Sequence, residues 1–216
     1  GTYYESRSGQ QEGQGVQKAA AAGKSTMKVH YIDVGQGSAV LVQSGVHFML
    51  IDGGDSDASS KVVSYLKRQK VKKLDYVVVS HYDSDHLNGV VGALNVFKVK
   101  RVIAPAYTAD SRVYESYCNI IAQKKIATTR PKAGKKYKLG KARFTILAPN
   151  SSGYVDENNY SIALKLVNGK NRFVITGDAE TESEYEMVEN GQNLSCDVYM
   201  AGHHLSLIHI SEPTRP

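Results

Sequence analysis

Residues 80–89 read SHYDSDHLNG and directly follow the apolar run Val77-Val78-Val79, which is typical of a buried strand. Four side chains of metal-binding type, His81, Asp83, Asp85 and His86, fall within six residues on what we expect to be one loop. Imidazole and carboxylate donors suit zinc, manganese or iron. The alternative is a polar loop with a capping aspartate before a helix, but so dense a charge cluster is costly unless a cation neutralises it. The stretch therefore predicts a metal site at the end of a strand.

The pattern around this stretch is rich in strands. Strands are predicted by apolar alternation or short apolar runs at 28–34, 39–43, 46–51, 74–80, 99–104, 144–147, 161–167, 173–176 and 198–201. The pair at 161–176 is joined by Asn168-Gly169, a strong hairpin signal. Helical spacing predicts helices around 62–66 and over 113–125 and 180–189. We therefore expect an α/β fold of two mixed sheets with helices outside.

Composition excludes several classes of protein. No apolar run approaches the ~20 residues of a membrane-spanning helix. Two cysteines in 216 residues cannot form the disulfide framework of a small secreted domain. The formal net charge of +6, from 27 basic and 21 acidic residues, is compatible with an anionic partner but identifies none.

The 80–89 stretch resembles the His-x-(His/Asp)-x-Asp-His signature of the metallo-β-lactamase fold superfamily. Three further segments follow that superfamily's order: 51–54 (IDGG), 175–178 (ITGD) and 201–204 (AGHH). The resemblance implies an αββα sandwich over residues 27–204. It narrows to the hydrolase domain of ComEC-type DNA-internalisation (competence) proteins through 33–37 (DVGQG), 158–161 (NNYS) and 202–204 (GHH). Ser38 departs from that family, which usually has aspartate there.

The resemblance implies a role for each candidate ligand. His81 and Asp83 would bind a first divalent cation, Asp85 and His86 a second, and Asp178 would bridge the two. His203 or His204 would complete the site, and the sequence leaves open which of them does. One or two ions, Zn²⁺ or Mn²⁺, are expected. Aspartate in place of a commoner histidine at position 83 favours the harder ion.

Some candidate residues are also expected to take part in catalysis, and others to support the metals or the substrate. The candidate catalytic residues are Asp85, Asp178 and His204. Asp85 or Asp178 would orient the attacking water, and His203 or His204 would lie beside the leaving group. Asp52 would buttress the metal loop, and Asp33 would hold a tight turn through Gly35 and Gly37. The candidates for supporting or substrate contacts are Asp33, Asp52, Asn159, Ser161 and His204.

A metal-dependent phosphodiesterase or nuclease acting on DNA, in a ComEC-like role in DNA uptake, is the leading interpretation. DNA or another phosphodiester would be its substrate, and lysine runs such as Lys72-Lys73, Lys98 and Lys100-Arg101 could hold a phosphate backbone. The same scaffold also hosts hydrolysis of cell-wall phosphoesters, lactones and β-lactams. A non-catalytic DNA- or wall-binding module is the alternative from another class.

The two ends of the chain differ from the rest in composition. Residues 1–26 are predicted to be a flexible leader because 8–15 are polar and glycine-rich. Residues 205–216 are predicted to be a non-native tail, so the domain is expected to be truncated at its C-terminus. The leader resembles the stretch after a removed signal peptide or membrane anchor. An extracellular or cell-surface location on a bacterial membrane is therefore expected.

Overall fold

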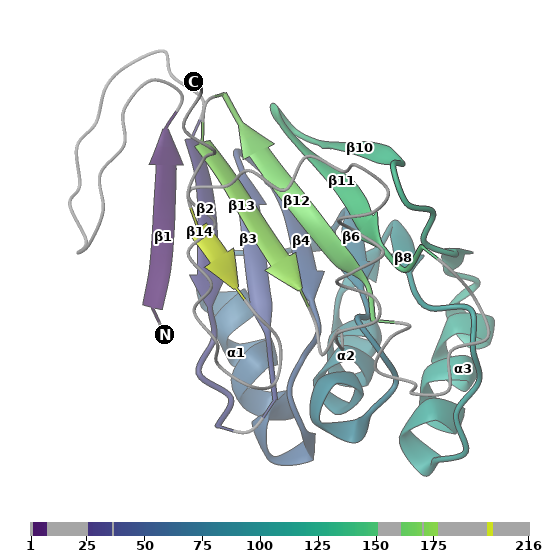
Figure 1. The fold of residues 1–216 in the computed structure, drawn as a ribbon. Helices are drawn as coiled ribbons and strands as arrows, with labels where there is room; N and C mark the ends of the chain where they lie inside the picture. The colour runs from purple at the N-terminus through teal and green to yellow at the C-terminus, as the bar shows by residue number, and fades with distance from the viewer. Residues whose placement is uncertain are drawn as a thin grey trace.

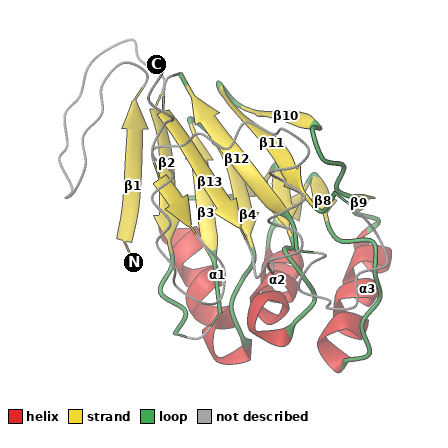
Figure 2. Cartoon of the chain, viewed as in Figure 1, coloured by secondary structure: helices red, strands yellow, loops and turns green. Residues whose placement is uncertain are grey.

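Two mixed β-sheets face each other in the computed structural model, and helices cover the outer face of one of them (Figures 1 and 2). The structure describes residues 2–7, 26–35, 37–150, 161–169, 171–176 and 198–200. In these residues the first sheet has the order β1 (Thr2–Arg7), β2 (Thr26–Tyr31), β3 (Val40–Ser44), β4 (His47–Ile51), β6 (Tyr76–Val78), β8 (Arg101–Ile103) and β9 (Ala127–Thr129). The second has the order β10 (Lys136–Leu139), β11 (Ala142–Ala148), β12 (Ala163–Asn168), β13 (Asn171–Thr176) and β14 (Val198–Met200).

The helices that cover the first sheet are α1 (Ser59–Arg68), α2 (Ser84–Val96) and α3 (Arg112–Lys124), with a short 3-10 turn at Ser56–Ala58 before α1. Figure 1 shows the three helices side by side. Within the described residues, no helix is long and apolar enough to cross a membrane.

Strand alternation creates a separate core on each face of the first sheet. In β4, Phe48 and Leu50 pack with the helices, whereas Met49 and Ile51 pack against the second sheet. Because successive side chains of a strand point to opposite faces, one apolar strand serves both cores. Phe144 of the second sheet is fully buried in the core between the two sheets.

The predicted fold class is confirmed, including the mixed character of both sheets. The first sheet is antiparallel from β1 to β4 and parallel from β4 to β9, and β14 adds a parallel strand to the second sheet. The hairpin at Asn168-Gly169 is also confirmed, with Gly169 at φ +61°. The predicted helix at 180–189 lies outside the described residues. Residues 2–7, within the predicted leader, form β1.

Three predicted elements differ in detail from the structure. Residues 84–96, which were expected to begin as a loop, form α2, so two of the four candidate ligands lie on its first turn. The predicted strand 74–80 is interrupted at Asp75, because its carboxylate accepts a hydrogen bond from Phe48 N at 3.1 Å. Its first part, β5 (Lys73–Leu74), pairs instead with β7 (Lys98–Val99), and this pairing also splits the predicted strand 99–104.

Parallel strands bring distant residues to one edge of the first sheet. β4, β6 and β8 run in the same direction, so their carboxyl ends lie together. Asp52 follows β4 and Ser80 follows β6, and Asp52 N donates to Val78 O at 2.9 Å. The sheet topology thus places the metal-loop stretch against Asp52.

His30 on β2 gives the fold a pH dependence. Burial lowers its pKa from 6.5 to about 4, and Nδ1 lies 2.8 Å from the Tyr65 hydroxyl on α1. Since the unfolded chain binds this proton more readily, His30 stabilises the fold fully above about pH 6.5, and this contribution is lost as the pH falls towards 4. Between pH 7 and 4.5 this amounts to about 2 kcal/mol.

Urea unfolding at these two pH values tests that expectation. His30→Gln should narrow the difference in unfolding free energy between pH 7 and 4.5 by about 2 kcal/mol. His47→Gln is the matched control because the His47 side chain is 46% exposed. An equal narrowing in both variants would contradict the assignment to His30.

Candidate metal centre

Three of the predicted ligands converge at the start of α2. One ligand atom from each of His81, Asp85 and His86 lies within 4.8 Å of the other two. The two imidazole rings lie with centroids 4.0 Å apart, and both histidines are buried. Asp85 is half-buried, with an oxygen 3.8 Å from His86 Nε2. This donor set has the composition and spacing of a cation site.

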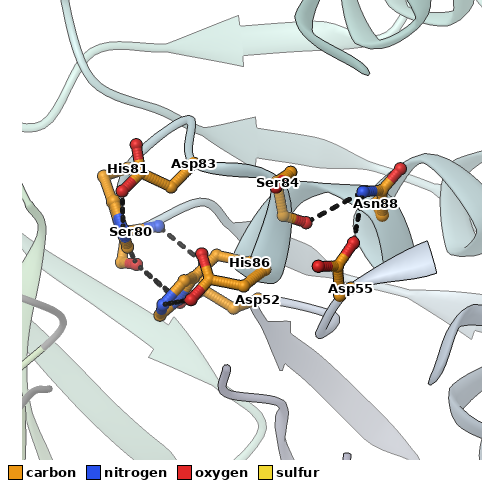
Figure 3. Close-up of polar contacts among 9 residues, drawn as sticks. Asp52, Asp55, Ser80, His81, Asp83, Ser84, His86 and Asn88 are labelled. Carbon is orange, nitrogen blue, oxygen red and sulfur yellow. Dashed lines mark hydrogen bonds and ion pairs between the residues drawn. The ribbon is translucent and has the colours of Figure 1, made fainter. Parts of the chain in front are cut away.

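Asp83 lies at the solvent-facing side of this cluster. Its carboxylate is 3.4 Å from His81 Nε2 and its side chain is 51% exposed. Figure 3 shows Asp83 and His81 facing each other from the loop that precedes α2. Asp83 can therefore reach both the metal cluster and a molecule that arrives from solvent.

Asp52 and Ser80 fix the orientation of both histidines through hydrogen bonds (Figure 3). Asp52 Oδ2 accepts from the Ser80 hydroxyl at 2.5 Å and lies 2.8 Å from His86 Nδ1. Asp52 Oδ1 accepts from Ser80 N at 2.8 Å. The Ser80 hydroxyl also lies 2.9 Å from His81 Nδ1.

This network determines the tautomer of each histidine. A carboxylate only accepts hydrogen bonds, so His86 Nδ1 must donate to Asp52. The single Ser80 hydroxyl hydrogen points to Asp52, so Ser80 Oγ accepts from His81 Nδ1. Both rings therefore carry their proton on Nδ1, and each Nε2 presents a lone pair to the ligand cluster. The residues present fit a divalent cation.

The backbone at the end of β4 is adapted to this arrangement. Asp52 has φ +59°, a left-handed conformation that aspartate tolerates better than most residues. Gly53 N donates to His86 O at 2.9 Å, and Gly89 N donates to Gly54 O at 3.0 Å. A Cβ added at Gly89 would lie 1.7 Å from Gly53 O, so the loop after β4 and α2 touch backbone to backbone.

A side-chain contact supports the same junction. Asn88 on α2 donates from Nδ2 to Asp55 Oδ1 at 2.8 Å and to Ser84 O at 3.0 Å (Figure 3). Asp55 thereby joins the loop after β4 to the helix that carries two of the ligands.

Gly37, the last residue of the predicted 33–37 turn, lies beside the site. Asp33 Oδ1 accepts from Gly35 N at 3.1 Å, which is the predicted local role of this residue. Gly37 has φ +94°, and a Cβ there would meet the Asp85 carbonyl oxygen at 2.0 Å. The backbone of Gly37 therefore packs directly against the first turn of α2.

Tyr107 forms a hydrogen bond with the loop that carries His81 and Asp83. Its hydroxyl accepts from Tyr82 N at 2.7 Å, between His81 and Asp83 in the sequence. The Tyr82 hydroxyl donates to Pro105 O at 2.8 Å, and the Tyr82 ring packs against Tyr107, Tyr114 and Tyr117. Burial raises the pKa of Tyr82 well above its usual value, so this phenol stays neutral and acts as a hydrogen-bond donor.

The other predicted residues lie partly outside the described region. Ser161 is fully buried, and its neighbour Ile162 donates from N to Ser80 O at 2.9 Å. The Ser161 hydroxyl has no hydrogen-bond partner within the part of the chain that the structure describes. Residues Asn159, Asp178, His203 and His204 lie outside the described residues, and their roles stay predictions.

Sequence reasoning assigned no role to Ser80 or Tyr107. Ser80 could have been found from its position, since a hydroxyl directly before the first ligand is placed to contact that ligand. Tyr107 carries no such signal, because only the fold brings the loop after β8 against the loop after β6.

Comparison with known proteins identifies relatives of this chain. The family model described as the Metallo-beta-lactamase superfamily matches residues 32–210. The chain is 28% identical over 197 residues to ComE operon protein 3 of Bacillus subtilis, covering 82% of this chain and 25% of that protein. It is 30% identical over 174 residues to Competence protein ComA of Neisseria gonorrhoeae, covering 80% of this chain and 23% of that protein. The predicted resemblance to ComEC-type competence proteins is confirmed, and the chain spans about a quarter of the length of these relatives.

Solved structures agree on the fold. A metallo-beta-lactamase of Cronobacter sakazakii superposes with a TM-score of 0.56 at 14% identity, covering 80% of this chain and 76% of that one. The subclass B3 enzyme MEM-A1, from a soil metagenome library, gives 0.57 at 17% identity over 82% and 76% of the two chains. At these identities the likeness concerns the fold alone.

Proposed function

Because the chain belongs to the metallo-beta-lactamase superfamily, we propose that it is a metal-dependent phosphodiesterase that cleaves DNA. The observation that carries the proposal is the donor set of His81, Asp85 and His86, with both imidazole Nδ1 atoms engaged by Asp52 and Ser80. Such a site is arranged to bind a cation rather than to act as an isolated histidine base.

The proposed ligands are His81, Asp83, Asp85 and His86, joined by Asp178 and either His203 or His204 as the sequence pattern implies. When bound, one or two Zn²⁺ or Mn²⁺ ions would activate water and neutralise the negative charge that develops on the phosphoryl oxygens. Carboxylate-rich coordination suits a phosphate substrate and a hard ion such as Mn²⁺.

The chain's own residues would position the reaction. Asp52 and Ser80 hold the two histidines, and half-buried Asp85 would accept a hydrogen bond from the attacking water. Exposed Asp83 lies where substrate enters. His204 would stand beside the leaving group and supply its proton.

Two observations support DNA as the substrate. One relative carries the name Competence protein ComA, and competence is a process that handles DNA. The chain's net charge of +6 also favours a polyanion. The same relationship supports a location at the cell surface or membrane, which we propose together with a role in DNA uptake.

A comparison of substrates tests the proposal. The full chain, supplied with Mn²⁺ or Zn²⁺, should cleave single- or double-stranded oligonucleotides and hydrolyse bis(p-nitrophenyl) phosphate faster than nitrocefin. Asp85→Ala should lower the rate at least 100-fold, whereas Asp110→Ala, which removes an exposed carboxylate outside the cluster, should leave the rate unchanged. Faster nitrocefin turnover, or equal DNA cleavage by wild type and Asp85→Ala, would contradict the proposal.

A further inference from the structure

A pocket of about 540 Å³ opens at the end of the first sheet that is remote from the metal centre. Its wall includes the start of β4 at His47 and Phe48 and the segment before β6 at Lys70, Lys72 and Lys73. The metal centre follows the carboxyl ends of the same two strands. Along β4, the five residues from His47 at the pocket to Ile51 beside Asp52 span on the order of 15 Å at about 3.3 Å per residue.

Lys70, Lys72 and Lys73 line the pocket, and the fold brings further lysines from a separate part of the sequence beside Lys73. β5 and β7 pair in parallel, with Lys73 beside Lys98, and Lys100 N donates to Leu74 O at 2.9 Å. The lysines at this end of the sheet lie at the surface of the protein. We call this set, Lys70, Lys72, Lys73, Lys98 and Lys100, the lysine cluster.

The charge of the lysine cluster is not neutralised within the described residues. None of its ammonium groups forms an ion pair there, and the acidic group of the pocket, Asp75, is engaged elsewhere. Asp75 Oδ2 accepts from Phe48 N at 3.1 Å and lies 3.3 Å from His47 Nδ1, with the side chain 15% exposed. Like charges on adjacent strands, as at Lys73 and Lys98, destabilise a sheet. An anionic ligand would relieve that repulsion.

The lining of the pocket favours a strand of nucleic acid. Val46, which is 83% exposed, gives the pocket apolar surface beside the lysines, so a base could lie against it while the phosphate backbone contacts the lysines. A membrane surface would call for a broad apolar face. Within the described residues only Val46 and Val96 are exposed large hydrophobic residues, and Val96 is not part of the pocket.

We propose that the lysine cluster and its pocket form a second nucleic-acid site, which holds the phosphate backbone of a DNA strand away from the metal centre. This inference rests on the proposed function for the identity of the ligand. It adds a binding surface that would retain the strand while another part of it occupies the metal centre.

Binding measured without catalysis separates the two proposals. The full chain in EDTA is titrated with a fluorescent single-stranded oligonucleotide at several salt concentrations. Lys70→Glu/Lys72→Glu should weaken binding at least tenfold and lower the salt slope by about 0.7 for each phosphate that a lysine no longer neutralises. Hydrolysis of bis(p-nitrophenyl) phosphate should be unchanged, because that substrate is too small to reach the pocket.

Lys61→Glu/Lys132→Glu is the matched control, since it makes the same change in net charge at surface lysines outside the pocket. Equal weakening by both double variants would overturn the inference, because net charge alone would then explain binding. Unchanged DNA binding by Lys70→Glu/Lys72→Glu would also overturn the inference. This holds whether or not that double variant loses binding to anionic phosphatidylglycerol vesicles. A chain that binds DNA through the lysines but cleaves nothing would contradict the proposed function alone.

The Lys98→Glu variant distinguishes a role of Lys98 in DNA binding from a purely structural role. The new carboxylate would lie beside Lys73 and replace repulsion with attraction. We expect an unfolding midpoint that is equal or higher together with weaker DNA binding. A lower midpoint with unchanged DNA binding would overturn the assignment of Lys98 to the site.

Discussion

Asp52→Asn is expected to lower the affinity for a divalent cation about 10- to 100-fold while the chain stays folded. Asparagine tolerates the φ of +59° at this position and can still accept from Ser80 N. Its amide cannot accept at both positions, so the NH₂ group would replace Oδ2 beside His86 Nδ1. His86 Nδ1 would then have to accept a hydrogen bond from this NH₂ group. The imidazole proton would therefore move to His86 Nε2, which faces the ligand cluster.

Cation titration calorimetry of wild type and Asp52→Asn measures this effect, with circular dichroism to verify the fold. Ser80→Ala is the companion variant, because it removes the partner of His81 Nδ1 and leaves the bond from His86 to Asp52 in place. We expect a smaller decrease in affinity for Ser80→Ala than for Asp52→Asn. An Asp52→Asn variant that binds the cation as tightly as wild type would refute the tautomer argument.

Gly89→Ala is expected to destabilise the chain by about 2–3 kcal/mol and to displace the ligands on α2. The added methyl would meet the Gly53 carbonyl oxygen at 1.7 Å, and a backbone atom cannot move aside without moving the loop after β4. This cost exceeds the gain of about 1 kcal/mol that alanine normally brings to a helix interior.

Gly92→Ala, one turn further along α2, provides the control. Its added Cβ would meet the Ser59 hydroxyl at 2.3 Å, a side-chain atom that can rotate away. Urea unfolding should therefore show a much smaller change for Gly92→Ala, of either sign. If the two variants unfold at the same urea concentration, the close approach of Gly53 and Gly89 does not control stability.

The sequence predicted those parts of the site that are encoded locally. The spacing of His81, Asp85 and His86 was sufficient to expect a cation site, and the short separation of Asp33 from Gly35 was sufficient to expect their hydrogen bond. Alternation of apolar residues identified most strands of both sheets, because burial on a pleated strand leaves a period of two.

Features that depend on long-range contacts could not be read from the sequence. The metal-ligand run and two glycines obscured α2, and one of these glycines, Gly89, is required by its backbone contact with the loop after β4. The bond from Tyr82 N to Tyr107 joins loops 25 residues apart. Likewise, nothing local places Lys73 beside Lys98, which follows from the pairing of β5 with β7.

The metal content of the purified full chain tests the central claim most directly. Wild type and Asp85→Ala are each equilibrated with Mn²⁺ or Zn²⁺, dialysed and analysed by inductively coupled plasma mass spectrometry, with Asp110→Ala as the control. The proposed centre predicts at least one equivalent of bound cation in wild type and Asp110→Ala, and much less in folded Asp85→Ala. Equal metal content in all three proteins would contradict the assignment of His81, Asp85 and His86 as a metal centre.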